Sequence, residues 1–245
     1  MKKIFNMDLK GKISLVTGAS RGIGRSISLA LAECGSEVFL TARDTDKLIE
    51  VKKEIERFGA KAHVLSADLS KKQDITCLFE QLASHATRLD ILINNAAIGI
   101  FKNIEDLSCE DFEKVFNINV KSMFLICKEA LKFMIKAKSG YIINISSVQG
   151  VKAYKQQSVY AASKHAVMGL TKAIAVEKQS DNIRVSAILP GGVDTDFIAQ
   201  ARPDLDRSIL IRPEDIANTV LYLLCLSPQA MVDEISIRRS GAAPF

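Results

Sequence analysis

The sequence has few of the residues that hold metal ions or form disulfide frameworks. Its 245 residues include five cysteines, an odd number without a Cys-x-x-Cys pair, and three widely separated histidines. Metal sites need such ligands at short, regular spacings, and a disulfide framework needs paired cysteines. We therefore expect no metal site, and we expect reduced, mostly buried thiols in a reducing compartment.

Long apolar runs and concentrated charge are also missing. The longest apolar run near the C-terminus, residues 220–226, is far shorter than the ~20 residues that a membrane helix needs. The formal net charge is +5, and four lysines and one aspartate within residues 1–12 supply +3 of it. A nucleic-acid-binding domain would gather its lysines and arginines on one face or helix. The sequence therefore predicts neither a membrane partner nor a nucleic-acid partner.

The composition is that of an ordinary globular protein. Hydrophobic residues make up 48% of the chain and charged residues 25%, which is typical of soluble domains. We expect one domain over residues 1–245, with residues 1–10 as a solvated basic leader. That leader lacks the apolar segment of a secretory signal peptide, so we expect a cytoplasmic protein.

Short apolar runs alternate with longer amphipathic segments along the whole chain. The predicted strands are residues 13–16, 38–41, 63–66, 91–94, 141–145, 185–189 and 234–238. The predicted helices are residues 25–34, 47–58, 71–86, 110–137, 158–178 and a last one that starts at Pro213. Strands that are apolar on both faces and alternate with helices indicate a parallel sheet covered on each side. We predict an α/β, doubly wound, Rossmann-like fold of about seven strands with helices on both faces.

A glycine-rich turn joins the first strand to the first helix. Residues 17–24 read Thr-Gly-Ala-Ser-Arg-Gly-Ile-Gly. Glycines in such a turn let a pyrophosphate approach the free N–H groups at the helix N-terminus. The spacing Gly-x-x-x-Gly-x-Gly differs from the general dinucleotide fingerprint, and the glycines could also serve only to form the turn. The turn therefore predicts a nucleotide and leaves the reaction open.

The end of the second strand bears on the choice between NADP and NAD. Arg43 offers a guanidinium suited to a 2′-phosphate, and Arg21 could reach the same group from the glycine-rich turn. Asp44 is the competing feature, because an acidic residue here would bind the ribose hydroxyls of NAD. Asp44 is also a good N-cap for the helix that follows, and we favour that role. NADP is the expected cofactor, and NAD is the less favoured one.

A Tyr/Lys pair and a serine carry the predicted chemistry. Tyr160 and Lys164 stand four residues apart in a helical segment, which places the phenol and the ammonium on one face. A nearby ammonium favours the phenolate and is expected to lower the tyrosine pKa from about 10. Ser147 follows the fifth strand, where its hydroxyl could bind a substrate carbonyl oxygen. Each feature alone is common, and the prediction depends on their coincidence.

Together with further motifs, these residues resemble the short-chain dehydrogenase/reductase family. The motifs lie in unbroken order between about residues 11 and 226: the glycine-rich turn at 17–24, Asn-Asn-Ala-Ala at 94–97, Asn119, Ser147, Tyr-x-x-x-Lys at 160–164, and Pro-Gly-Gly-Val-Asp-Thr at 190–195. Within the family the chain looks most like the β-ketoacyl-[acyl carrier protein] reductases. The resemblance implies NADPH-dependent reduction of a 3-oxoacyl compound or similar ketone to a secondary alcohol.

The resemblance also implies roles for single residues. Tyr160 would be the general acid, Lys164 would lower its pKa and bind the nicotinamide ribose, and Ser147 would orient the carbonyl. Asn119 would hold a water that links Lys164 to solvent. With Arg43, the residues expected to bind the cofactor are Gly18, Ser20, Arg21, Ile23, Asp68, Leu69, Asn95, Ala96, Tyr160, Lys164, Val193 and Thr195.

Two other functions remain as alternatives. One is an NAD-dependent alcohol dehydrogenase on the same scaffold. The other is a catalytically silent NADP-binding sensor, which would be expected to lose Ser147, Tyr160 or Lys164, and all three are present. The substrate stays open, because the apolar residues near the site could form a pocket or could be ordinary packing. These residues are Ile100, Phe101, Val148, Val151, Tyr154, Phe197 and Ile198.

The chain departs from the family pattern at three places. Ala97 replaces a usual glycine, the segment between Thr195 and Pro213 is short, and Arg238-Arg239 stand where many relatives have Asp-Gly-Gly.

The helices predicted at 110–137 and 158–178 carry more apolar residues than one buried stripe requires. In relatives these helices form a two-fold, four-helix contact, so we expect a homodimer or homotetramer.

Overall fold

A seven-stranded parallel sheet forms the centre of the protein. The computed structural model describes residues 7–201 and 205–243, and residues 1–6 of the predicted basic leader lie outside the described residues. The strand order is β3-β2-β1-β4-β5-β6-β7, and each neighbouring pair is parallel. The strands are β1 (Ile13–Thr17), β2 (Glu37–Thr41), β3 (Ala62–Val64), β4 (Ile91–Asn94), β5 (Gly140–Ile145), β6 (Ile183–Pro190) and β7 (Glu234–Ile237). The predicted doubly wound α/β fold is confirmed.

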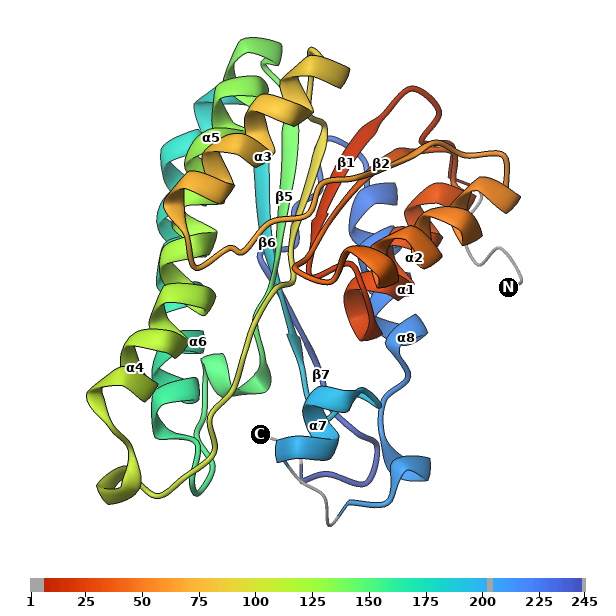
Figure 1. Ribbon diagram of the computed structural model, residues 1–245. Helices are drawn as coiled ribbons and strands as arrows, with labels where there is room; N and C mark the ends of the chain where they lie inside the picture. The colour runs from red at the N-terminus through yellow and green to blue at the C-terminus, as the bar shows by residue number, and fades with distance from the viewer. Residues whose placement is uncertain (1–6, 202–204, 244–245) are drawn as a thin grey trace.

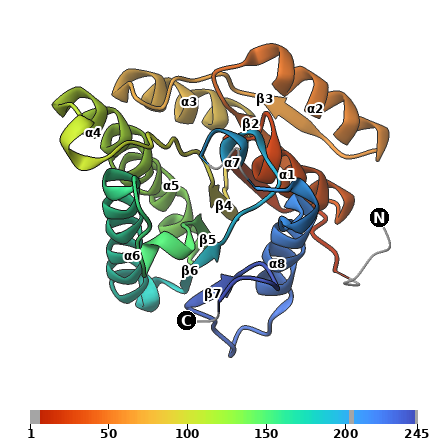
Figure 2. The ribbon, with the colours of Figure 1, turned by 90° about the horizontal axis from the view of Figure 1, so that it is seen from below.

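Helices cover both faces of this sheet (Figures 1 and 2). One layer contains α1 (Gly22–Glu33), α2 (Thr45–Arg57) and α8 (Pro213–Cys225), and the opposite layer contains α3 (Lys72–His85), α5 (Ser122–Ala137) and α6 (Ser158–Lys178). Shorter helices are α4 (Cys109–Phe116) and α7 (Asp196–Ala201), with 3-10 turns at Ile104–Asp106, Val148–Gly150, Gln179–Asp181 and Arg207–Ile209. The apolar strand residues are buried between the two layers, which is why both faces of each central strand are hydrophobic.

Several helix ends follow the local rules that the sequence predicts. Gly35 has φ +95°, a conformation that glycine adopts readily just after a helix, and it ends α1. Asp44 caps α2, because its carboxylate accepts a hydrogen bond of 3.1 Å from the N–H of Lys47. Pro213 is the first residue of α8, where its missing N–H costs nothing. The favoured capping role of Asp44 is therefore confirmed.

The structure corrects some predicted boundaries. The helix predicted at 110–137 consists of α4, a π-helical segment at Asn117–Lys121 and α5. A π-helical segment adds residues to the turn and redirects the side chains within it, and this one buries Asn119. The first helix begins at Gly22, inside the glycine-rich turn, and β3 ends at Val64, two residues before the predicted end.

The strand order reverses at β1, which lies between β2 and β4. In open parallel sheets, ligands bind at such a point, beyond the carboxyl ends of the strands. The glycine-rich turn, Arg43, Asn95 and Ser147 each follow the carboxyl end of a strand, so the fold brings them to one edge. Within the described residues, no helix has the length and apolarity to cross a membrane.

Candidate active site

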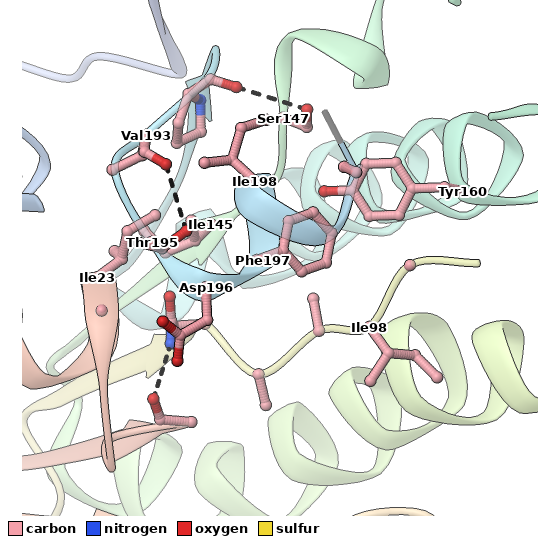
Figure 3. Close-up of a pocket in the computed structure, with 18 of the residues that line it drawn as sticks. Ile23, Ile98, Ile145, Ser147, Tyr160, Val193, Thr195, Asp196, Phe197 and Ile198 are labelled. Carbon is pink, nitrogen blue, oxygen red and sulfur yellow. Dashed lines mark hydrogen bonds between the residues drawn. The ribbon is translucent and has the colours of Figure 1, made fainter. Parts of the chain in front are cut away.

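One large cavity lies along the carboxyl edge of the sheet (Figure 3). Its volume of about 1510 Å³ exceeds the ~300–1,000 Å³ of a common small-molecule site, as a dinucleotide together with a second substrate would require. All predicted cofactor-binding residues line it, and so does Ser147. Asn119 is the predicted site residue that does not line the cavity, since it is buried behind the wall.

The glycine-rich turn leaves no room for side chains at its base. A Cβ atom on Gly24 would lie 2.2 Å from the carbonyl oxygen of Gly18, and one on Gly22 would lie 2.9 Å from the Thr195 methyl carbon. Gly18 and Gly22 also have positive φ angles of 65° and 55°. Asn95 fastens the turn, because its amide donates hydrogen bonds to the carbonyl oxygens of Thr17 (3.0 Å) and Gly18 (3.2 Å). The glycines therefore shape a concave backbone surface at the start of α1.

The two arginines expected near a 2′-phosphate have different surroundings. Arg43 is exposed at the cavity edge, and no hydrogen bond or ion pair joins its guanidinium to another residue within 7–201 or 205–243. Arg21 instead pairs with Asp196, at the start of α7, at 3.2 Å, with both side chains more than 60% exposed. The pKa of the Asp68 carboxyl is lowered mainly by its hydrogen bond with Ser70 and also by the charge of Arg43. Arg43 therefore has no ion pair to break on meeting an anion, whereas Arg21 must first leave Asp196. The Arg21–Asp196 pair was not predicted, because no sequence pattern links residues so far apart.

Ser147, Tyr160 and Lys164 meet at the other end of the cavity. All three are buried, and Tyr160 and Lys164 lie on one face of α6 as their spacing predicts. Ser147 caps the turn after β5: its hydroxyl accepts a hydrogen bond from the N–H of Gln149 at 3.1 Å. The same Ser147 hydroxyl donates a hydrogen bond of 3.5 Å to the carbonyl oxygen of Pro190, drawn as a dashed line from Ser147 in Figure 3. Lys164 Nζ lies 5.7 Å from the centroid of the Tyr160 ring.

The pKa values of this pair differ from the sequence-based expectation. Burial raises the pKa of Tyr160 above its ordinary value, and a hydrogen bond with Ser147 lowers it only in part. Burial lowers the pKa of Lys164 from 10.5 to about 8. The predicted lowering of the tyrosine pKa by the ammonium is therefore not found, because loss of hydration is the larger effect on both groups. At neutral pH the tyrosine is a neutral phenol that can donate a proton.

Asn119 lies in the π-helical segment, and hydrogen bonds with Ile98 and Ser163 hold its side chain. Its amide nitrogen donates to the carbonyl oxygen of Ile98 at 2.9 Å and to the hydroxyl of Ser163 at 3.0 Å. Its amide oxygen accepts from the N–H of Ile98 at 2.9 Å. Asn119 therefore ties α6 to the segment after β4, which forms one wall of the cavity.

The apolar residues of uncertain role mostly face the cavity. Val151 does not line it; the ones that do are Ile100, Phe101, Val148, Tyr154, Phe197 and Ile198. Gln149 is a lining residue that the sequence analysis missed. It is buried, and its amide nitrogen donates to the amide oxygen of Gln157. Its place two residues after Ser147, in the turn that Ser147 caps, was the available signal.

The described residues offer no comparable site for a metal. No group of three or more histidine, cysteine, aspartate or glutamate side chains among them is placed to hold an ion. Cys34 and Cys127 are buried, Cys77 is partly buried, and Cys109 and Cys225 are exposed, so the expectation of mostly buried thiols is wrong.

Comparison with known proteins identifies the family to which this chain belongs. The family model for short chain dehydrogenases matches residues 12–206. The chain is 36% identical over 224 residues to the 3-oxoacyl-[acyl-carrier-protein] reductase of Aquifex aeolicus, covering 88% of this chain and 90% of that protein. It is 37% identical over 195 residues to the 3beta-hydroxysteroid dehydrogenase of Mediterraneibacter gnavus, covering 79% of this chain and 70% of that protein.

The solved structures agree with the sequence relatives. A short-chain oxidoreductase from a metagenome, in complex with NADP, superposes with a TM-score of 0.84 at 33% identity, over 95% of this chain and 98% of that chain. The predicted resemblance is thus confirmed by sequence and by fold. The chain belongs to the short-chain dehydrogenase family and is an NAD(P)-dependent oxidoreductase.

Proposed function

We propose that the protein reduces a ketone, a 3-oxoacyl compound or a similar carbonyl, to a secondary alcohol with NADPH. The observation that carries this proposal is the placement of Ser147, Tyr160 and Lys164 in the same cavity as the glycine-rich turn. A phosphate-binding surface and a proton donor at two ends of one cavity suit a reaction between a dinucleotide and a carbonyl. The 36% identity to a 3-oxoacyl-[acyl-carrier-protein] reductase supports the reductive direction.

The residues at the glycine-rich turn fit a dinucleotide. The concave backbone that a Cβ on Gly24 would fill lies against the N-terminus of α1, where free N–H groups favour a pyrophosphate. Gly18, Ser20, Arg21 and Ile23 would surround that group. Asp68, Leu69, Asn95 and Ala96 would border the adenosine, and Val193 and Thr195 the carboxamide. When bound, the cofactor supplies the hydride for the carbonyl carbon.

Arg43 supports NADP over NAD. Its exposed guanidinium follows β2, at the cavity edge, and forms no hydrogen bond or ion pair with a side chain inside residues 7–201 and 205–243. Asp44, which would favour NAD, is engaged with the backbone N–H of Lys47 at 3.1 Å. A guanidinium binds phosphate with charge-assisted hydrogen bonds, so a 2′-phosphate would find a partner here.

The protein's own groups would move the proton and orient the carbonyl. Tyr160, a neutral phenol at neutral pH, would donate its hydroxyl proton to the carbonyl oxygen as the carbon is reduced. The Ser147 hydroxyl would donate a hydrogen bond to the same oxygen. Lys164 would supply positive charge beside Tyr160 and bind the nicotinamide ribose. Asn119 would hold the water that returns a proton from solvent.

Replacement of Tyr160 by phenylalanine tests this proposal. NADPH consumption would be measured at 340 nm with a panel of diketones, β-keto esters and acyl-carrier-protein thioesters. We expect Tyr160→Phe to bind NADPH nearly as the wild type does and to lose on the order of 10²–10⁴-fold in turnover, because the ring remains but carries no proton. Turnover within a factor of a few of the wild type would remove Tyr160 from the mechanism. A wild type that binds NADPH and reduces nothing in the panel would favour the silent sensor.

A further inference from the structure

Two phenylalanine rings from distant parts of the chain pack against the ring of the proposed proton donor. Phe101 follows β4, Tyr160 lies on α6 and Phe197 lies on α7. The ring centroids are 5.9 Å apart for Phe101 and Tyr160, 5.7 Å for Phe101 and Phe197, and 5.4 Å for Tyr160 and Phe197. Figure 3 shows the Phe197 ring directly beside the Tyr160 ring. Each ring therefore touches both others, and all three line the cavity.

The absence of a side chain at Gly99 makes room for the Phe101 ring. A Cβ atom on Gly99 would lie 2.2 Å from the tip of that ring and 2.9 Å from two further ring carbons. The ring can lie there because residue 99 has no side chain. Phe101 and Phe197 are nearly perpendicular, at 87°, so one presents its edge to the face of the other.

Phe197 lies on a short helix with an exposed ion pair at its start. The helix α7 has six residues, and its first, Asp196, is tied to Arg21 by an exposed ion pair of 3.2 Å. Exposed ion pairs contribute little to stability, so this pair opposes a movement of α7 only weakly. The contacts of the Phe197 ring with Phe101 and Tyr160 are the ones that a substrate ring would have to replace. Neither phenylalanine belongs to the hydrophobic core around the sheet, so a substrate that separates the two rings leaves that core intact.

A carbonyl that reaches the hydroxyl groups of Tyr160 and Ser147 must place its attached group near these rings. Aromatic faces and edges attract flat π-systems beyond simple burial of apolar area. We propose that Phe101 and Phe197 form an aromatic clamp that selects ketones with a flat aromatic ring next to the carbonyl. This inference rests on the proposed function and names a substrate class for that same site.

Three ketones of equal carbon number test the clamp. Acetophenone has a flat aromatic ring, 1-cyclohexylethanone has a puckered saturated ring, and 2-octanone has a straight chain. We expect the wild type to show its highest kcat/KM with acetophenone. The ratio of kcat/KM for acetophenone to that for 1-cyclohexylethanone should fall roughly threefold to tenfold in Phe197→Leu and in Phe101→Leu, because leucine keeps an apolar side chain and removes the ring.

A matched control and a gentler variant sharpen the test. Phe58→Leu removes an exposed ring outside the cavity and should leave the ratio unchanged. Gly99→Ala keeps both phenylalanines but forces the Phe101 ring to move, so it should lower the ratio as Phe101→Leu does. An unchanged ratio in folded Phe197→Leu and Phe101→Leu, verified by circular dichroism, would overturn the clamp.

Binding without turnover separates this inference from the proposed reaction. Calorimetry would measure acetophenone and 1-cyclohexylethanone binding to protein saturated with NADP⁺, which has no hydride to give. Tighter binding of acetophenone that disappears in Phe197→Leu supports the clamp even if no ketone is reduced. Equal binding of both ketones contradicts the clamp even if reduction occurs.

Discussion

Lys164 donates a hydrogen bond of 3.0 Å from its ammonium nitrogen to the carbonyl oxygen of Ile145, the last residue of β5. The ammonium is buried, and one backbone carbonyl replaces only part of its hydration. Burial therefore lowers the pKa of Lys164 to about 8. The same bond holds the side chain at the end of the strand, beside the Tyr160 ring. The position and the charge of the Lys164 ammonium thus depend on how α6 lies against the end of β5.

The buried ammonium should make the stability of the protein depend on pH. The pKa of Lys164 is lower in the folded protein than its ordinary value of 10.5, so the unfolded chain binds more protons between about pH 8 and 10.5. Stability from this group therefore rises with pH in that window, by at most about 3 kcal/mol. We expect the wild type to gain more in Tm between pH 7.5 and 9.5 than Lys164→Met does. Parallel Tm curves for the two proteins would contradict the burial of a charged lysine.

Replacement of Arg43 should separate the two cofactors. Only NADPH carries a 2′-phosphate, so Arg43→Ala should weaken NADPH on the order of tenfold to a hundredfold, as expected for the loss of a charge-assisted contact. NADH binding should change little. Dissociation constants for both cofactors, measured by calorimetry, check this result. Equal weakening of both would mean that Arg43 is structural and would remove the argument for NADP.

The tight contact at Gly24 predicts a severe effect from one methyl group. In Gly24→Ala the new carbon would lie 2.2 Å from the Gly18 carbonyl oxygen and 2.5 Å from the Asn95 amide nitrogen. The backbone must shift, so we expect a loss of about 1–3 kcal/mol in the free energy of unfolding and loss of NADPH binding. Gly169→Ala on α6 is the control, since no heavy atom lies within 4 Å of the added carbon. Urea denaturation and cofactor titration of both variants would show whether the turn tolerates a side chain.

Exposed apolar side chains on the outer helices predict a homo-oligomer. Phe112 on α4 is 46% exposed, Phe124 on α5 is 47% exposed, and Val176 on α6 is 79% exposed. Burying them against a second copy would remove apolar surface from water. Light scattering at micromolar concentration should give a dimer or tetramer, and Phe124→Glu should shift it toward the monomer. Phe58→Glu, just after the end of α2, should not. A monomeric wild type would contradict this prediction.

The sequence by itself determined the order of elements and the ends of many helices. Strands apolar on both faces specify a covered parallel sheet, Gly35 and Pro213 mark helix ends, and Tyr160 and Lys164 share a face because a helix repeats every 3.6 residues. These features depend on residues that are close along the chain. The glycine-rich turn and Ser147 are far apart in the sequence, but each follows a predicted strand, and parallel strands end at the same edge of the sheet. Their placement at one edge could therefore also be predicted.

Only the tertiary structure decided the features that join distant segments. The Arg21–Asp196 ion pair and the contact between Phe101 and Phe197 connect residues about 100 or more positions apart, which no periodicity can reveal. The π-helical segment that buries Asn119 departs from the regular helix that its sequence predicts. The pKa directions of Tyr160 and Lys164 also needed the structure, because they depend on how much water packing removes from each group. The local sequence specifies the backbone conformation and which side chains share one face of a helix or strand. Burial and long-range contacts arise only when the helices pack on the two faces of the sheet.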